Sequence, residues 1–187
     1  MSPVTHFLTG WVLANAAPLN RRERAVVTLA CVAPDFDGLG AIAEVLTRNS
    51  AHPLLWFSRY HHSLHTLAFA VVVAVLAYFF ARRSWLACGM AFVAFHLHLL
   101  EDVLGARGPD GYSWPIPYLM PFSDRWQWSW SGEWALNAWP NAAMTIVLLA
   151  ITLWLARKRG FSPVEMISEK ADAAVVGALR GASKNSP

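Results

Sequence analysis

Charge and cysteine are both scarce in this chain of 187 residues. Only 14% of the residues are Asp, Glu, Lys or Arg, while 56% are hydrophobic; a soluble domain carries about 25% charged residues. A folded domain of this composition would have too few charges to face water on all sides, and the chain is too apolar to stay disordered. There is no glycine period and no sustained heptad, which excludes collagen and coiled coil. The two cysteines, Cys31 and Cys88, lie inside apolar runs, so we expect small buried side chains and no disulfide scaffold.

The net charge of +3 is less informative than its distribution. Most basic residues form clusters, namely Arg21-Arg22-Glu23-Arg24, Arg82-Arg83 and Arg157-Lys158-Arg159, and each cluster adjoins a hydrophobic run. A nucleic-acid-binding protein would gather such residues on one face among aromatic or polar readers. The pattern is typical of membrane flanks, and we expect no nucleic-acid partner.

Three runs are long and apolar enough to predict membrane-spanning helices: residues 66–81, 84–100 and 135–156. A helix needs about 20 apolar residues to cross the hydrocarbon core. The third run reaches this length alone, and the first two reach it with their flanks. None shows the alternation of a barrel strand.

Two shorter apolar segments precede these runs. Residues 5–19 read as a helix, and residues 25–33 form an apolar stretch that Pro34 is expected to stop. We interpret the pair as a helical hairpin that either spans the membrane or is half-inserted. The predicted fold class is therefore an all-α polytopic helical membrane protein with about four to five membrane-embedded helices.

The C-terminal segment predicts one more helix. Ser162-Pro163-Val164-Glu165 has the pattern of a capping box with proline at the first helical position. Apolar residues then recur at helical spacing, which is typical of an amphipathic helix on a membrane surface. We predict an embedded domain over residues 1–159 and a cytoplasmic amphipathic tail over residues 160–187.

The positive-inside rule predicts the orientation. The three basic clusters fall at alternate ends of successive helices, so one topology puts them all in the cytoplasm. Residues 35–60 and 104–134 then lie outside, and they hold more acidic than basic residues. Tryptophans crowd the second exterior stretch, where they form either an aromatic belt in the headgroup layer or a wall that faces a substrate.

Histidines and aspartates gather at the predicted exterior ends of the helices. Apart from His52, every histidine lies in a short motif: Thr5-His6, His61-His62-Ser63-Leu64-His65 and His96-Leu97-His98-Leu99-Leu100-Glu101-Asp102; Pro34-Asp35-Phe36-Asp37 follows the second helix. We expect these motifs to converge. Ionisable groups inside a membrane are costly and usually functional.

The spacings favour a metal centre. His61 or His62 would share a helical face with His65, and His98 shares one with Asp102, whereas His96 points elsewhere. Mixed histidine and carboxylate ligands bind zinc, manganese or iron. We therefore predict one or two divalent ions, with zinc preferred. A hydrogen-bonded polar network and an ion- or proton-conducting path are the alternatives.

These motifs resemble the LexA-binding inner-membrane (YdjM-type) family of membrane-bound, metal-dependent hydrolases over roughly residues 3–130. The resemblance rests on Thr5-His6 with Gly10, on the Pro-Asp-x-Asp motif, on the His-x-x-x-Asp motif that ends at Asp102, and on Gly111 with Pro121-Phe122-Ser123-Asp124-Arg125. The family usually has His-Arg and then His-Ser. Here Arg59 lies upstream instead, and we predict His61 with His65 as ligands, keeping His62 as the alternative.

The layout is also remotely similar to zinc-dependent phospholipase C. That similarity implies one ion held by Asp35, His65, His98 and Asp102, and a second that His6 shares with Asp102.

The resemblances imply a metal-dependent hydrolase in the bacterial cytoplasmic (inner) membrane. Because the predicted site lies on the exterior, periplasmic side near the headgroup layer, we expect metal-activated water to cleave a lipid or lipid-linked phosphoester there. Asp37 or Asp124 would orient water or take a proton, and Arg125 or Arg59 would hold the phosphate. The alternative function is a non-catalytic metal-binding or metal-transporting membrane protein.

Overall fold

The computed structural model describes residues 1–108 and 111–181, and within these ranges the regular structure is helical. The elements, in chain order, are α1 (Pro3–Ala14), α2 (Arg21–Val32), the 3₁₀ helix η1 (Ala33–Leu39), α3 (Gly40–Thr47), α4 (Trp56–Tyr60), α5 (Leu67–Phe80), α6 (Trp85–Gly105), α7 (Trp139–Arg159), the 3₁₀ helix η2 (Pro163–Met166) and α8 (Glu169–Gly181). The predicted all-α class is confirmed.

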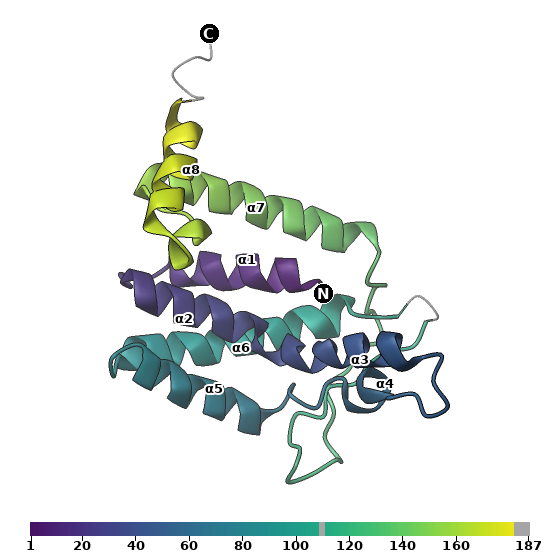
Figure 1. The fold of residues 1–187 in the computed structure, drawn as a ribbon. Helices are drawn as coiled ribbons and strands as arrows, with labels where there is room; N and C mark the ends of the chain where they lie inside the picture. Colours follow the sequence, from purple (N-terminus) through teal and green to yellow (C-terminus); the bar gives the residue numbers. More distant parts are fainter. Residues whose placement is uncertain (109–110, 182–187) are drawn as a thin grey trace.

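The bundle is formed by α1, α2, α5, α6 and α7, which run alongside one another (Figure 1). Helix α2 packs against α1, α5 and α6, and α7 packs on the outer side of α1. Buried alanines of α5 and α6, among them Ala77, Ala87 and Ala91, lie in one core cluster with residues of α1 and α2. Small side chains let helix backbones approach closely, which is how helices pack inside a membrane.

Three helical stretches have the length and apolarity to cross a membrane: Arg21–Thr47, Trp85–Gly105 and Trp139–Arg159. Helix α6 is about 31 Å long at 1.5 Å per residue, which matches a hydrocarbon core of about 30 Å. Helices α5 and α1 are shorter and pack beside these spans. The number of full-length spans among the described residues is therefore lower than the four to five embedded helices predicted.

The α-helix α2 ends at Val32, just before Pro34, as predicted, but the chain stays helical beyond the proline, which was not predicted. Pro34 occupies the first turn of η1, where its missing N–H leaves no helical hydrogen bond unmade. The chain then continues through α3 to Thr47. The segment that follows Asp35 is thus helical for a further three turns or so, at about 3.6 residues per turn.

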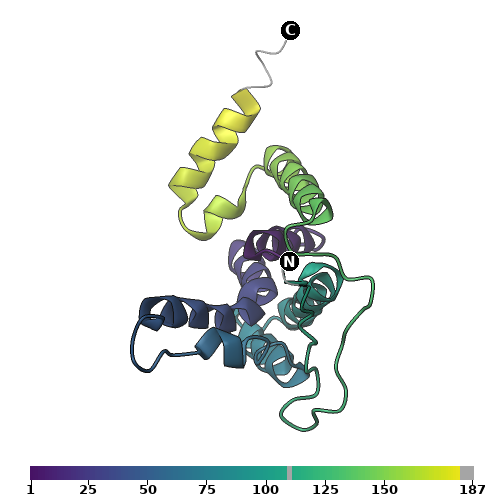
Figure 2. The same cartoon turned by 90° about the vertical axis from the view of Figure 1, so that its right-hand side faces the viewer.

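The C-terminal segment starts differently from the prediction. Ser162 caps only the short helix η2, and its hydroxyl accepts from the Val164 N–H. The Glu165 carboxylate does not complete a capping box, because it pairs with Arg24 of α2 at 2.7 Å. The longer helix α8 begins at Glu169 and projects away from the bundle (Figure 2). Residues 182–187 of the predicted tail lie outside the described residues.

Candidate metal centre

The predicted ligands come from separate segments that meet at one end of the bundle. His6 lies near the start of α1, Asp35 in η1 and His65 in the turn before α5, while His98 and Asp102 are one turn apart on α6. The ring centroids of His6 and His98 are 3.8 Å apart, and those of His65 and His98 are 5.0 Å apart. The predicted convergence is confirmed.

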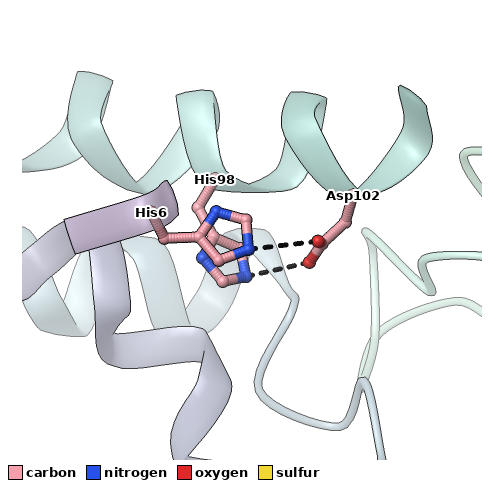
Figure 3. Close-up of side chains that lie close together, drawn as sticks. All are labelled: His6, His98 and Asp102. Carbon is pink, nitrogen blue, oxygen red and sulfur yellow. Dashed lines mark ion pairs between the residues drawn. The ribbon is translucent and has the colours of Figure 1, made fainter. Parts of the chain in front are cut away.

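Asp102 lies at the centre of this cluster (Figure 3). Its Oδ1 is 3.2 Å from His6 Nε2, whereas its Oδ2 is 3.0 Å from His98 Nε2 and 3.3 Å from His65 Nε2. The α-amino group of Met1 also contacts Oδ1. Because the two oxygens face different imidazoles, the carboxylate could serve as a ligand in more than one of the groups that these residues form.

The cluster is closed off from solvent on most sides. The imidazoles of His6, His65 and His98 are fully buried, and Asp102 is 6% exposed. Burying several ionisable groups together costs free energy unless they are paired or bind an ion. So dense a cluster within a small domain is therefore a candidate functional site.

Among the described residues, three groups have ligand atoms that all lie within 4.8 Å of one another. The groups overlap, and their members are His6, His98 and Asp102; Asp35, His65 and His98; and His62, His65 and Asp102. Such overlap suits either one ion or two adjacent ions that share ligands. The predicted His61 belongs to none of them, and His62 takes its place.

Unpartnered polar atoms test whether these residues fit a divalent ion. Asp35 Oδ2 and His62 Nδ1 are buried and have no hydrogen-bond partner. Buried polar atoms are nearly always hydrogen-bonded, so a group of orphans calls for an explanation. Nitrogen and carboxylate oxygen are suitable donors for zinc, manganese or iron. The residues therefore fit a divalent ion.

Each buried imidazole is oriented from its outer side. His98 Nδ1–H donates to the Cys31 carbonyl at 2.8 Å, and His65 Nδ1–H donates to Asp37 Oδ2 at 3.2 Å. Such bonds fix the tautomer and direct Nε2 inward, as in histidines that bind metals. The cluster is therefore prearranged with three Nε2 atoms around Asp102.

Glu101 orients the imidazole of His6 from its outer side. No role for Glu101 was predicted from the sequence. His6 Nδ1–H donates to Glu101 Oε2 at 2.7 Å, and the Thr9 hydroxyl donates to Oε1 at 2.5 Å. The sequence signal that could have identified Glu101 is its place beside Asp102 in an apolar helix, where an unpaired carboxylate is costly.

Asp37 connects the cluster to His61. Its Oδ1 accepts from His61 Nδ1–H at 3.1 Å, and its Oδ2 also accepts from the Leu64 N–H. The His61 ring stacks on Phe57 and meets the edge of Trp114 at 5.0 Å. Both Asp37 oxygens are thus engaged in positioning the histidine turn.

The histidine turn is not the helix start that was predicted. Helix α4 ends at Tyr60 and α5 begins at Leu67, so helical spacing does not apply between them. His62 has a φ of 70°, in the left-handed region that few residues other than glycine adopt. This conformation aims His62 at the cluster and His61 at Asp37. Backbone strain of this kind often occurs at functional sites.

The pKa values of two histidines in this turn shift in opposite directions. Burial, together with the neighbouring imidazoles of His65 and His61, lowers the pKa of His62 to about 3. Burial also disfavours the charged form of His65, but its hydrogen bonds with Asp102 and Asp37 outweigh this effect and raise its pKa. Perturbed pKa values of this kind cluster at functional sites.

A pocket of about 660 Å³ leads to the cluster. Asp35, His62 and Asp102 line it, together with His61 and Trp114. The cluster is therefore accessible from the end of the bundle where α6 terminates, through an opening with aromatic walls.

Three residues with predicted roles lie elsewhere. Asp124, Arg125 and Arg59 are exposed, and none is among the residues that line this pocket. Their roles stay predictions. His96 points away from the cluster, as predicted, and bonds to the Tyr118 hydroxyl at 2.9 Å.

Together, the fold and the site define a helical membrane protein with a buried histidine–carboxylate cluster at one end of its bundle. The family model described as YdjM inner membrane protein matches residues 1–169, and the chain belongs to this family. No curated protein and no solved structure matches the chain. The similarity to zinc-dependent phospholipase C therefore stays a prediction.

Proposed function

We propose that the protein is a metal-dependent hydrolase of the inner membrane that holds one or two divalent ions, preferably zinc. The observation that carries this proposal is the set of overlapping ligand groups around Asp102. The ligands would be His6, Asp35, His62, His65, His98 and Asp102, with His62 replacing His61 of the sequence prediction. Manganese and iron suit the same donors.

Shared ligands support a two-ion arrangement. Asp35, His65 and His98 would hold one ion, and His6 would hold a second with Asp102 between the two. When bound, divalent ions lower the pKa of water and neutralise charge on a phosphoryl oxygen.

The chain's own proton carrier would be His61. It lines the pocket, and Asp37 accepts its Nδ1–H, which leaves Nε2 to receive or deliver a proton. A carboxylate that orients an imidazole in this way supports general acid–base chemistry. Asp37, which the sequence predicted as catalytic, would then act by positioning His61.

A lipid or lipid-linked phosphoester is the substrate class that we propose. The pocket opens at the end of a spanning helix, near the depth of the headgroup layer, and apolar side chains such as Leu39, Phe57 and Trp114 line it. The basic clusters lie at the opposite end of the bundle, so the positive-inside rule favours a periplasmic opening.

The test combines metal analysis with hydrolysis. Protein purified in detergent should retain one or two equivalents of zinc or manganese and cleave a chromogenic phosphodiester. Asp102→Asn should lower metal content and reduce hydrolysis by about a thousandfold or more, comparable to losing a whole catalytic assembly. Glu169→Gln makes the same chemical change at the other end of the bundle and should leave both unchanged.

Two outcomes would contradict the proposal. Metal uptake into proteoliposomes without any hydrolysis would indicate a transporter with the same ligands. A folded protein that binds no metal would indicate a structural polar network.

A further inference from the structure

A second polar pocket lies at the end of the bundle opposite the metal centre. Three segments surround its volume of about 570 Å³: the start of α2 with Arg21 and Arg22, the turn between α5 and α6 with Arg82, and η2 with Met166. The described residues that line it include three arginines and no carboxylate. The pocket is therefore suited to an anion.

Two of these arginines are available to a ligand. Arg21 is engaged, since it donates to the Glu165 carbonyl at 2.5 Å and to the Glu169 carboxylate at 2.7 Å. The guanidinium groups of Arg22 and Arg82 are exposed and bond to no other side chain or backbone group in the described part of the chain. Arg82 also has a φ of 55°, in a tight turn that presents it outward.

An apolar groove begins at the same arginine. Arg22 lines both the basic pocket and a groove of about 470 Å³ between α2 and α5. Every other side chain along the groove is apolar, from Val26 and Phe80 to Ala33 and Phe69. Ala30 and Ala77 are 3% and 2% exposed, and they form its floor.

The length of the groove matches one leaflet of a bilayer. The α5 side of the groove, from Phe69 to Phe80, rises by about 16 Å at 1.5 Å per residue. Half of the hydrocarbon core is about 15 Å. The groove thus runs from a charged headgroup level to about the middle of the membrane, which is the reach of a single acyl chain.

We propose that this composite surface binds an anionic phospholipid from the leaflet at the basic end. The phosphodiester lies between Arg22 and Arg82, and one acyl chain lies in the groove between α2 and α5. Arginine forms charge-assisted hydrogen bonds with phosphate, and basic pockets between spanning helices recognise anionic headgroups. The proposal goes beyond the proposed function, because the site lies at the far end of the bundle from the metal centre.

Native mass spectrometry of the full chain in neutral detergent tests this inference with phosphatidylglycerol as the probe and phosphatidylcholine as the neutral comparison. We expect selective retention of phosphatidylglycerol. Arg22→Gln with Arg82→Gln should weaken its binding roughly 25-fold, at about fivefold for each charge. Arg83→Gln removes the neighbouring charge, which does not line the pocket, and should have a much smaller effect.

The groove is tested independently of the charges. Leu76→Trp narrows it, while Val75→Trp adds the same side chain to α5 outside it. Only Leu76→Trp should weaken phosphatidylglycerol binding. Equal binding of the two lipids would overturn the proposal, and so would a loss of binding with Arg83→Gln equal to that of the Arg22→Gln and Arg82→Gln variant. Competition by millimolar glycerol phosphate would also overturn it, because it would identify a site for a soluble anion.

Discussion

The ring centroids of His61 and His62 lie 4.4 Å apart, yet only His62 belongs to a group that could hold a metal ion. His61 is held by Asp37 at the mouth of the pocket. These adjacent residues therefore have different places in the site: His62 lies in the cluster and His61 lies at its entrance.

Alanine variants of the two histidines should separate these tasks. His62→Ala should weaken zinc affinity by at least about 100-fold, because it removes a direct donor, whereas outer partners alone cost 10–100-fold. His61→Ala should keep the metal and lose about 100-fold in phosphodiester hydrolysis, the low end for a general acid–base residue. Elemental analysis and steady-state rates measure both. Loss of metal in His61→Ala alone would reverse the two assignments.

Glu101 should act on the metal centre through His6. Glu101→Gln retains the shape of the side chain but removes the charge that orients the Nδ1–H, so zinc affinity should fall by about 10–100-fold. A competitive titration with a zinc chelator dye measures the change. Glu169→Gln, at the exposed pair with Arg21, is the control and should bind zinc as the unaltered protein does. If Glu101→Gln left zinc affinity unchanged, the orienting role would be wrong.

Gly10 is required where α1 meets α2. A Cβ atom at this position would lie 2.7 Å from Cys31 Cβ and 2.8 Å from the Thr28 carbonyl oxygen. Gly10→Ala should therefore force the helices apart and lower the free energy of unfolding by about 1–3 kcal/mol, as overpacking does. Denaturant unfolding in detergent micelles measures it. Gly89→Ala on α6 meets no atom within 4 Å and should be neutral or stabilising by up to about 1 kcal/mol.

Arg24 and Glu165 form a buried ion pair that fastens the C-terminal segment to α2. Two guanidinium nitrogens bond to the two carboxylate oxygens at 2.7 and 2.9 Å, and the ring of Phe161 packs 3.8 Å from the guanidinium. Glu165→Gln leaves the buried cation without its counter-charge and should cost about 3–5 kcal/mol. Glu169→Gln breaks the exposed pair with Arg21 and should cost less than about 1 kcal/mol. Similar losses in the two variants would contradict the buried role of Arg24.

Much of the helical framework could be predicted because hydrophobicity is a local property. The uncharged run of residues 66–81 became α5, and the run of residues 84–100 became most of α6. The placement of His98 and Asp102 one turn apart follows from helical geometry alone. The helical continuation after Pro34 could not be predicted equally well, because a proline that ends one helix looks the same in sequence as a proline in the first turn of the next.

The sequence by itself determined that this is a helical membrane protein and that its histidines and aspartates lie at helix ends, since apolar runs and spacing along one helix depend only on neighbouring residues. Only the tertiary structure decided which of these side chains meet. The approach of His62 to Asp102, the bond from His6 to Glu101 and the pairing of Arg24 with Glu165 all join segments far apart in the chain. Such contacts depend on how whole helices pack, and no local pattern encodes that arrangement.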